Sequence, residues 1–186
     1  TGNYGPYNDV FPEVDWYEAM MRKIALSQNY NLNIRGGTEK MNYFFSIGSQ
    51  YDGDNYKIEK QADFDPRNYF KRYNWRSNFD FNVSRSTVIS INIAGKIGYV
   101  NETGGPENFT TIMQSPSNVF PIRYSDGHWG DAEAMGYNIV SNVTDRGQRM
   151  EKQFQGWYDL IIKQKLNSIT KGLSAKGRVS YNQYST

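Results

Sequence analysis

The sequence predicts an all-β fold in which six strands run up and down in antiparallel order. Apolar and polar residues alternate at every second position in six segments, and the connections between these segments are alternately short and long. Successive side chains of an extended chain point to opposite sides, so each segment forms a strand with one apolar and one polar face. Such strands belong either to a transmembrane β-barrel or to a soluble β-sandwich.

Composition excludes several classes of protein. The 186 residues include 21 basic and 19 acidic ones without long like-charge runs, which argues against a nucleic-acid partner. Cysteine is absent and His128 is the one histidine, so disulfides, thiolate metal sites and cysteine nucleophiles are excluded. We expect no cofactor and no catalysis. No apolar run approaches the roughly 18 to 20 residues of a membrane-spanning helix, and the mean hydropathy is −0.76, which excludes helical spans but does not test for spanning strands.

The first 27 residues are expected to form a loop that contains one short helix. Trp16, Met20 and Ile24 recur at helical spacing, which predicts a helix over Glu13 to Ala25. An apolar stripe of this kind usually docks on its own protein.

The clearest two-strand pattern runs from Gln28 to Tyr51. Its first strand alternates Tyr30, Leu32 and Ile34 with the polar residues Asn31, Asn33 and Arg35. The sequence Gly36-Gly37-Thr38-Glu39 predicts a tight turn, because glycine adopts positive φ without a Cβ clash. The second strand places Tyr43, Phe45, Ile47 and Tyr51 on its apolar side.

A second hairpin is predicted from strands over Tyr69 to Val83 and Thr87 to Tyr99. The first of these two strands has the longest clean alternation in the chain, and its polar side includes Arg72, Arg76, Asn78 and Asp80. The preceding acidic segment, from Asp52 to Asn68, lacks the ligand spacing of an EF-hand and is predicted to be a solvated loop.

The segment from Val100 to Met150 shows no periodicity, and a connection of that length is normally functional or disordered. A third hairpin follows, with strands predicted over Gln153 to Leu166 and Leu173 to Tyr184. The long segment contains the candidate ligand or partner residues Tyr124, Asp126, His128 and Trp129. Exposed rings beside hydrogen-bonding groups can bind sugar rings or peptide side chains, although loop aromatics also pack against their own loop. An acid–base site of Asp126 and His128 is the third alternative.

The connection lengths favour a barrel. Outer-membrane barrels have short periplasmic turns and long extracellular loops, and the aromatic residues Tyr30, Tyr51, Tyr69 and Tyr99 lie near strand ends. Six strands cannot close a barrel, for which about eight are the practical minimum, so this alternative predicts a piece of a longer chain. The other alternative is a soluble carbohydrate-binding β-sandwich that uses Tyr124 and Trp129.

Three stretches resemble the SusC/RagA family of TonB-linked outer-membrane transporters. The first runs SQNYNLNIRGGTEK from Ser27 to Lys40, the second KRYNWRSNFD from Lys71 to Asp80, and the third ITKGLS from Ile169 to Ser174. The first stretch is fairly specific to the family, whereas the other two are supportive. The likeness covers most of residues 15–99 and 153–184.

The resemblance implies a role and an orientation. Family members close about 22 strands around an N-terminal plug, pair with a SusD-like surface lipoprotein, and import glycans or peptides with energy from TonB. It implies the outer membrane of a Gram-negative bacterium. Residues 1–27 and 100–150 would be extracellular loops, and residues 28–99 and 151–186 would be barrel strands. The apolar side chains would face outer-membrane lipid, and the lumen would receive Asn31, Asn33, Arg35, Arg72, Arg76, Asn78 and Asp80.

Overall fold

The computed structural model describes residues 7–105, 109–131 and 138–186 and divides the chain into two compact units. The sheet unit comprises Ser27–Tyr51, Phe70–Tyr99 and Glu151–Thr186. The loop unit comprises Thr1–Leu26, Asp52–Tyr69 and Val100–Met150. Each unit is described by itself below.

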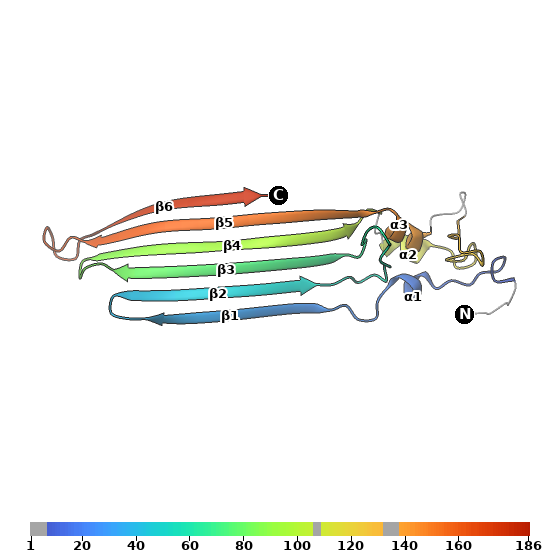
Figure 1. Ribbon diagram of the computed structural model, residues 1–186, viewed down its shortest axis with the longest axis horizontal. Coiled ribbons are helices and arrows are strands. Elements are labelled where there is room, and N and C mark those ends of the chain that lie inside the picture. Colours follow the sequence, from blue (N-terminus) through green and yellow to red (C-terminus); the bar gives the residue numbers. More distant parts are fainter. Residues whose placement is uncertain (1–6, 106–108, 132–137) are drawn as a thin grey trace. The chain divides into compact units, whose positions relative to one another are not determined.

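One six-stranded sheet contains every strand of the described residues, in the order β1-β2-β3-β4-β5-β6 (Figure 1). Each strand therefore pairs with its neighbour in the chain, as an up-and-down topology requires. No second sheet lies among the described residues, so the sandwich alternative does not describe this fold. The bounds are β1 Ser27–Gly37, β2 Met41–Asp52, β3 Tyr69–Asn82, β4 Thr87–Thr103, β5 Gln148–Lys165 and β6 Ser174–Ser185.

The first hairpin turn lies later than the sequence predicts. Gly36 and Gly37 belong to β1, and neither has positive φ. The chain turns instead at Thr38, whose backbone N–H donates to the Met41 carbonyl and whose Oγ1 accepts from the Met41 N–H. Glycine is needed at position 36 for another reason, because a Cβ there would collide with the ring of Tyr43.

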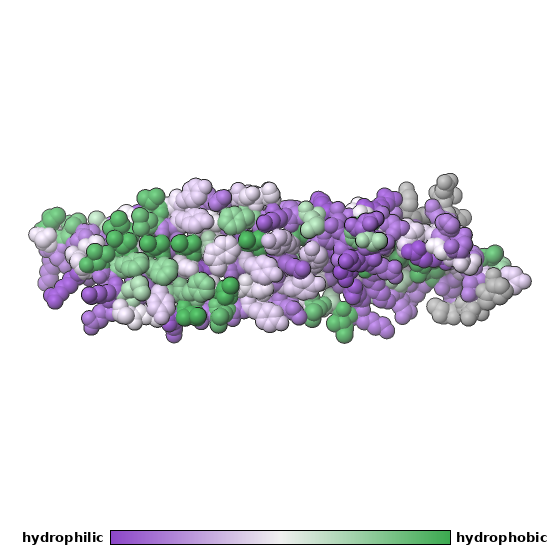
Figure 2. Space-filling model, in the orientation of Figure 1, coloured by the Kyte–Doolittle hydropathy of each residue, from purple (hydrophilic) through white to green (hydrophobic). Residues whose placement is uncertain are grey.

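The two faces of the sheet differ sharply in polarity. Leu32, Leu160 and Val179 are 58%, 43% and 70% exposed, although each lies within a strand. Hydrophobic side chains gather over the sheet near the hairpin turns (Figure 2). The alternation places these residues on what we call the apolar face: Tyr30, Leu32, Ile34, Tyr43, Phe45, Ile47, Tyr51, Tyr73, Trp75, Phe79, Phe81, Ile89, Ile91, Ile93, Ile97, Tyr99, Phe154, Tyr158, Leu160, Ile162, Val179 and Tyr181. The opposite side is the polar face.

Every strand contributes at least one tyrosine to the apolar face. In β5 and β6 these tyrosines are direct partners, since Tyr158 pairs with Tyr181 and their ring centroids lie 5.9 Å apart. Tyrosine rings are amphipathic and are enriched where apolar and aqueous surroundings meet. One tyrosine from each strand, in the order β1 to β6, gives the set Tyr30, Tyr51, Tyr73, Tyr99, Tyr158 and Tyr181.

The loop unit contains the buried apolar core of the described residues. Three short helices, α1 Trp16–Met20, α2 Phe109–Gln114 and α3 Ile139–Asp145, surround it. The rings of Trp16 and Phe120 meet edge to face at 5.4 Å, and Trp16 Nε1 donates to the Pro116 carbonyl at 3.0 Å. The core comprises Trp16, Met20, Ile58, Ile112, Phe120, Ile139 and Val143, each less than 4% exposed.

Buried polar side chains join the segments of the loop unit. The Asn101 amide donates to the carbonyls of Asp65 and Arg67, both at 2.7 Å. Thr103 Oγ1 donates to the Val143 carbonyl at 2.6 Å. These bonds fix backbone groups that neither helix nor sheet satisfies, so the connecting segments form an ordered body.

The predicted N-terminal helix is correct in place but wrong in extent. Asp15 caps α1, but Met21 is already extended and forms a β-bridge with Tyr56. Ile24, assigned to the helical stripe, is 84% exposed. Strands β4 and β5 also reach further than predicted, and α2 and α3 were not predicted. Among the described residues, no helix is both long enough and apolar enough to cross a membrane.

Candidate functional site

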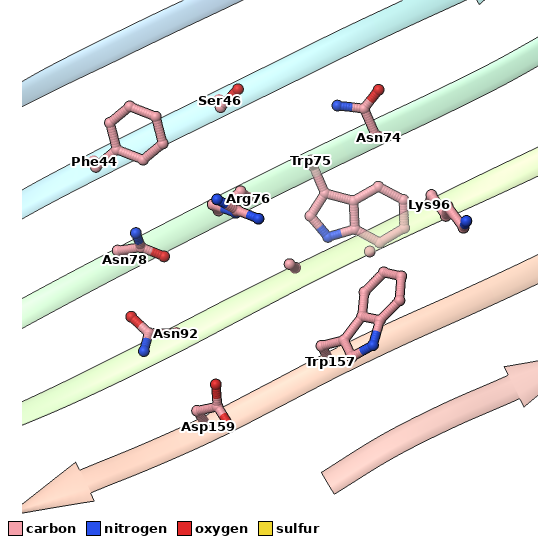
Figure 3. A pocket seen from close by; sticks show the side chains of 12 residues that line it. Phe44, Ser46, Asn74, Trp75, Arg76, Asn78, Asn92, Lys96, Trp157 and Asp159 are labelled. Carbon is pink, nitrogen blue, oxygen red and sulfur yellow. The ribbon is translucent and has the colours of Figure 1, made fainter. Parts of the chain in front are cut away.

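A hollow of about 650 Å³ lies on the polar face of the sheet (Figure 3). Strands β2 to β5 supply its walls. The even-numbered residues of β2, β3 and β4 and the odd-numbered residues of β5 point to this side. Trp75 and Gly95 also border the hollow, although their side-chain positions belong to the apolar face. The remaining lining residues are Phe44, Ser46, Asn74, Arg76, Asn78, Asn92, Ala94, Lys96, Trp157 and Asp159.

The carboxylate and the lysine of the hollow have different kinds of partner. Asp159 accepts two hydrogen bonds from Arg178 Nη2, at 2.8 and 2.9 Å, and one from Ser180 Oγ at 2.6 Å. Lys96 Nζ lies 5.9 Å from the ring centroid of Trp157. The carboxylate is therefore neutralised within the sheet, while cations, amides and an aromatic ring line the open space. Such a set can bind a polar ligand by hydrogen bonds and ring contact.

A glycine of β2 leaves room for amide side chains from the two neighbouring strands beside the hollow. A Cβ at Gly48 would lie 2.6 Å from Asn31 Oδ1 and 2.8 Å from the Asn74 side-chain amide. A side chain at position 48 would therefore push both amides aside from these positions. Gly48 thus leaves the side-chain amides of Asn31 and Asn74 on the polar face where β1, β2 and β3 run side by side.

The residues predicted to face a lumen all alternate onto the polar face, but they do not form one cluster. Arg76 and Asn78 line the hollow, whereas Asn31 lies beside Gly48. Asp80 accepts a hydrogen bond from Ser90. The Nε of Arg72 is buried without a hydrogen-bond partner among the described residues. Asn33 and Arg35 follow Asn31 along β1 at the same parity.

Of the residues that line the hollow, only Arg76 and Asn78 are among the predicted site residues, and those missed include Phe44, Lys96, Trp157 and Asp159. Trp157 interrupts the polar side of its strand in the sequence, but the alternation alone places it on the polar face. A tryptophan among lysine and aspartate residues of one parity was the signal that could have identified the hollow.

The predicted loop residues form a small turn within the loop unit. The Tyr124 N–H donates to the His128 carbonyl at 2.8 Å, and Gly127 has φ +91°. The Arg123 guanidinium lies 3.4 Å from the Trp129 ring centroid, and Trp129 Nε1 donates to Asp145. Trp129 therefore packs against its own loop, so one ring face and its only donor are already used.

Asp126 and His128 of this turn are exposed to solvent, whereas Tyr124 is half-buried. His128 Nδ1 lies 3.1 Å from Asp126 Oδ2, and the two side chains are 82% and 65% exposed. Hydrogen bonds from the His128 backbone N–H and then from its side chain lower the pKa of Asp126. The Tyr124 hydroxyl donates to the Asp131 carbonyl over 3.5 Å, which is a weak bond.

The acidic segment after β2 is a turn whose carboxylate binds backbone groups. Asp54 accepts hydrogen bonds at 2.7 Å from the Tyr56 and Asn68 N–H groups. Burial raises the pKa of Asp54 and outweighs these bonds, which act to lower it. No cluster of three metal-ligating side chains occurs among residues 7–105, 109–131 and 138–186.

Comparison with known proteins gives a likeness in fold. No protein-family model and no curated protein sequence matches the chain. Among solved structures, the chain is similar to a chain of the RagAB peptide importer in its closed-closed state, with a TM-score of 0.64 and 16% identity over 91% of this chain. The chain spans 19% of that chain's length. The likeness confirms the predicted antiparallel fold class, as an open six-stranded piece of the importer's fold.

Proposed function

We propose that the sheet unit is a sector of the wall of a transmembrane β-barrel in an outer-membrane nutrient importer. The apolar face contacts lipid, and the polar face with its hollow lines the aqueous interior. The observation that carries this proposal is the apolar face itself, on which aliphatic side chains such as Leu32, Ile47 and Val179 stay exposed in β1, β2, β5 and β6.

A soluble protein would not leave such a face uncovered. The largest apolar patch on a typical monomer measures a few hundred Å², and larger patches mark interfaces or membrane contacts. In a membrane, the acyl chains of the lipids would cover the whole apolar face and keep it from water. The unpaired edges of β1 and β6 then need further strands, because unpaired backbone groups in lipid cost several kcal/mol each. The proposed barrel is therefore completed by other parts of a longer protein.

The finer proposal is membership of the SusC/RagA family, with a SusD-like lipoprotein and TonB as partners and glycans or peptides as substrates. The family-like stretches and the similarity to the RagAB peptide importer support it. The loop unit is joined to the strand ends away from the hairpin turns, which is the extracellular side in such barrels. Its half-buried Tyr124 and its exposed Asp126 and His128 are candidates for contact with lipoprotein or cargo. The proposed role involves no catalysis.

Fractionation of cells that produce the full-length protein tests the proposal. We expect the protein in the outer-membrane fraction, released by detergent and not by high salt or carbonate. Recovery in the soluble fraction as a folded protein would overturn the proposal. Within the membrane fraction, added protease should cleave the loop unit from outside while the hairpin turns stay protected.

A further inference from the structure

The apolar face carries positive charge only. Within the strands of the sheet unit, Lys71 and Lys152 are the charged residues that alternate onto this face, and no aspartate or glutamate of these described strands does so. A charged side chain on a lipid-facing surface is costly near the middle of a bilayer and tolerable near its edges. The positions of the two lysines along their strands therefore decide whether the apolar face can contact lipid.

Both lysines lie at the same end of the face and make the same contact. Lys71 is near the start of β3 and Lys152 near the start of β5, so each is far from the hairpin turn that ends its strand. Lys71 Nζ lies 5.8 Å from the Tyr51 ring centroid, and Lys152 Nζ lies 5.8 Å from the Tyr99 ring centroid. Each pair joins neighbouring strands, β2 with β3 and β4 with β5.

Resting on the proposed function, we propose that this end of the apolar face is a binding site for a lipid with a phosphate-bearing head group of net negative charge. The two ammonium groups bind the phosphate oxygens, and the tyrosine rings below them contact the head-group boundary. The aliphatic residues nearer the turns contact the acyl chains. A free phosphate would use the lysines alone, whereas a lipid matches the cations and the adjoining apolar surface together.

The polar face offers a matched comparison. Lys96 lies 5.9 Å from the Trp157 ring centroid, so it makes the same kind of contact with an aromatic ring. It lines the hollow together with Trp157 and the Asp159 carboxylate, on the face opposite the exposed aliphatic side chains. A lipid head group is therefore expected to respond to Lys71 and Lys152 and not to Lys96.

Reconstitution of the full-length protein tests this proposal. Thermal unfolding is compared in nanodiscs of phosphatidylcholine alone and of phosphatidylcholine mixed with phosphatidylglycerol, and bound lipid is counted by native mass spectrometry. We expect preferential retention of phosphatidylglycerol, weakened about fivefold by Lys71→Gln or Lys152→Gln and more by the double change. Lys96→Gln should retain it unchanged, and Lys71→Arg with Lys152→Arg should preserve the preference.

Two results would overturn the lipid site. One is an unchanged lipid preference in the double glutamine variant. The other is equal stabilisation by inorganic phosphate in phosphatidylcholine nanodiscs, which would indicate a site for free anions. Membrane fractionation of the same variants separates this outcome from failure of the proposed function, because a protein that inserts normally without head-group preference contradicts the lipid site alone.

Discussion

In the loop unit, Phe120 and Ile139 are each 1% exposed, whereas in the sheet unit Ile34 and Ile47 are 50% and 48% exposed. The residue types are similar, and the difference lies in what surrounds them. The loop unit folds helices and connecting segments around a common core. The sheet unit is a single layer of strands whose apolar face has no layer of its own chain described against it.

This difference fits the proposal that the two units have different surroundings, namely water for the loop unit and lipid for the apolar face of the sheet unit. A unit that buries its apolar side chains gains the hydrophobic free energy of leaving water, about 25 cal/mol per Å². A strand face whose apolar side chains stay uncovered gains no hydrophobic free energy in water. In lipid the same face loses none, because its surroundings are apolar. The alternation along each strand and the buried core of the connections are thus two responses to the hydrophobic effect.

The largest expected effect is on the core of the loop unit. Phe120→Ala removes a ring that packs edge to face on Trp16, and we expect a loss of about 3–5 kcal/mol in the local stability of this unit. Hydrogen exchange of the α1 and α3 amides in the full-length protein measures it. Tyr17→Ala, in the same helix as Trp16 but 52% exposed, should cost far less. Equal losses would contradict the assignment of a separate core.

The next effect distinguishes the two faces of one strand. Ile93→Arg places a charge on the apolar face of β4, and Asn92→Arg places the same charge on the polar face. We expect the first change to destabilise the protein in lipid bilayers by about 2–4 kcal/mol and the second to have little effect. Denaturant unfolding in vesicles measures the difference. A larger cost at Asn92 would reverse the assignment of the faces.

The smallest effect concerns acid stability of the loop unit. The Arg67 side chain donates to Asp65 at 2.6 and 2.7 Å and holds the pKa of Asp65 below its usual value of 3.8. The ion pair therefore stabilises the folded unit above pH 3.8, and this contribution is lost as the pH falls through the folded pKa. Both side chains are partly exposed, so we expect less than about 1 kcal/mol. Arg67→Gln should reduce this acid dependence of amide exchange, and an unchanged dependence would refute the assignment.

Sequence reasoning predicts the strands and their order well because the signal is local. Two-residue alternation gives the faces of β1 to β6, and connection length separates tight turns from long segments. The turn at Thr38 was misplaced because Gly36 and Gly37 lie within β1, where Gly36 packs against Tyr43, and do not reverse the chain. Lys71 and Lys152 interrupt the alternation at single apolar positions, and one such interruption in a strand carries no pattern of its own.

The loop unit could not be predicted because its contacts join distant parts of the chain. Trp16 and the Pro116 carbonyl are 100 residues apart, and Ile58 reaches the same core from a third segment. Helices α2 and α3 have six and seven residues, too few for a helical repeat to appear. Alternatives for Trp129 included a sugar platform, but the structure places Arg123 against its ring.

The central claim, that one face of the sheet meets lipid and the other water, is tested most directly by spin labels along β5. This chain contains no cysteine, so cysteines introduced at positions 159–162 can be labelled in the full-length protein after reconstitution. Labels at Leu160 and Ile162 should be relaxed by oxygen dissolved in lipid, and labels at Asp159 and Ile161 by a water-soluble nickel complex. Uniform accessibility to nickel at all four positions, or the reverse alternation, would contradict the claim.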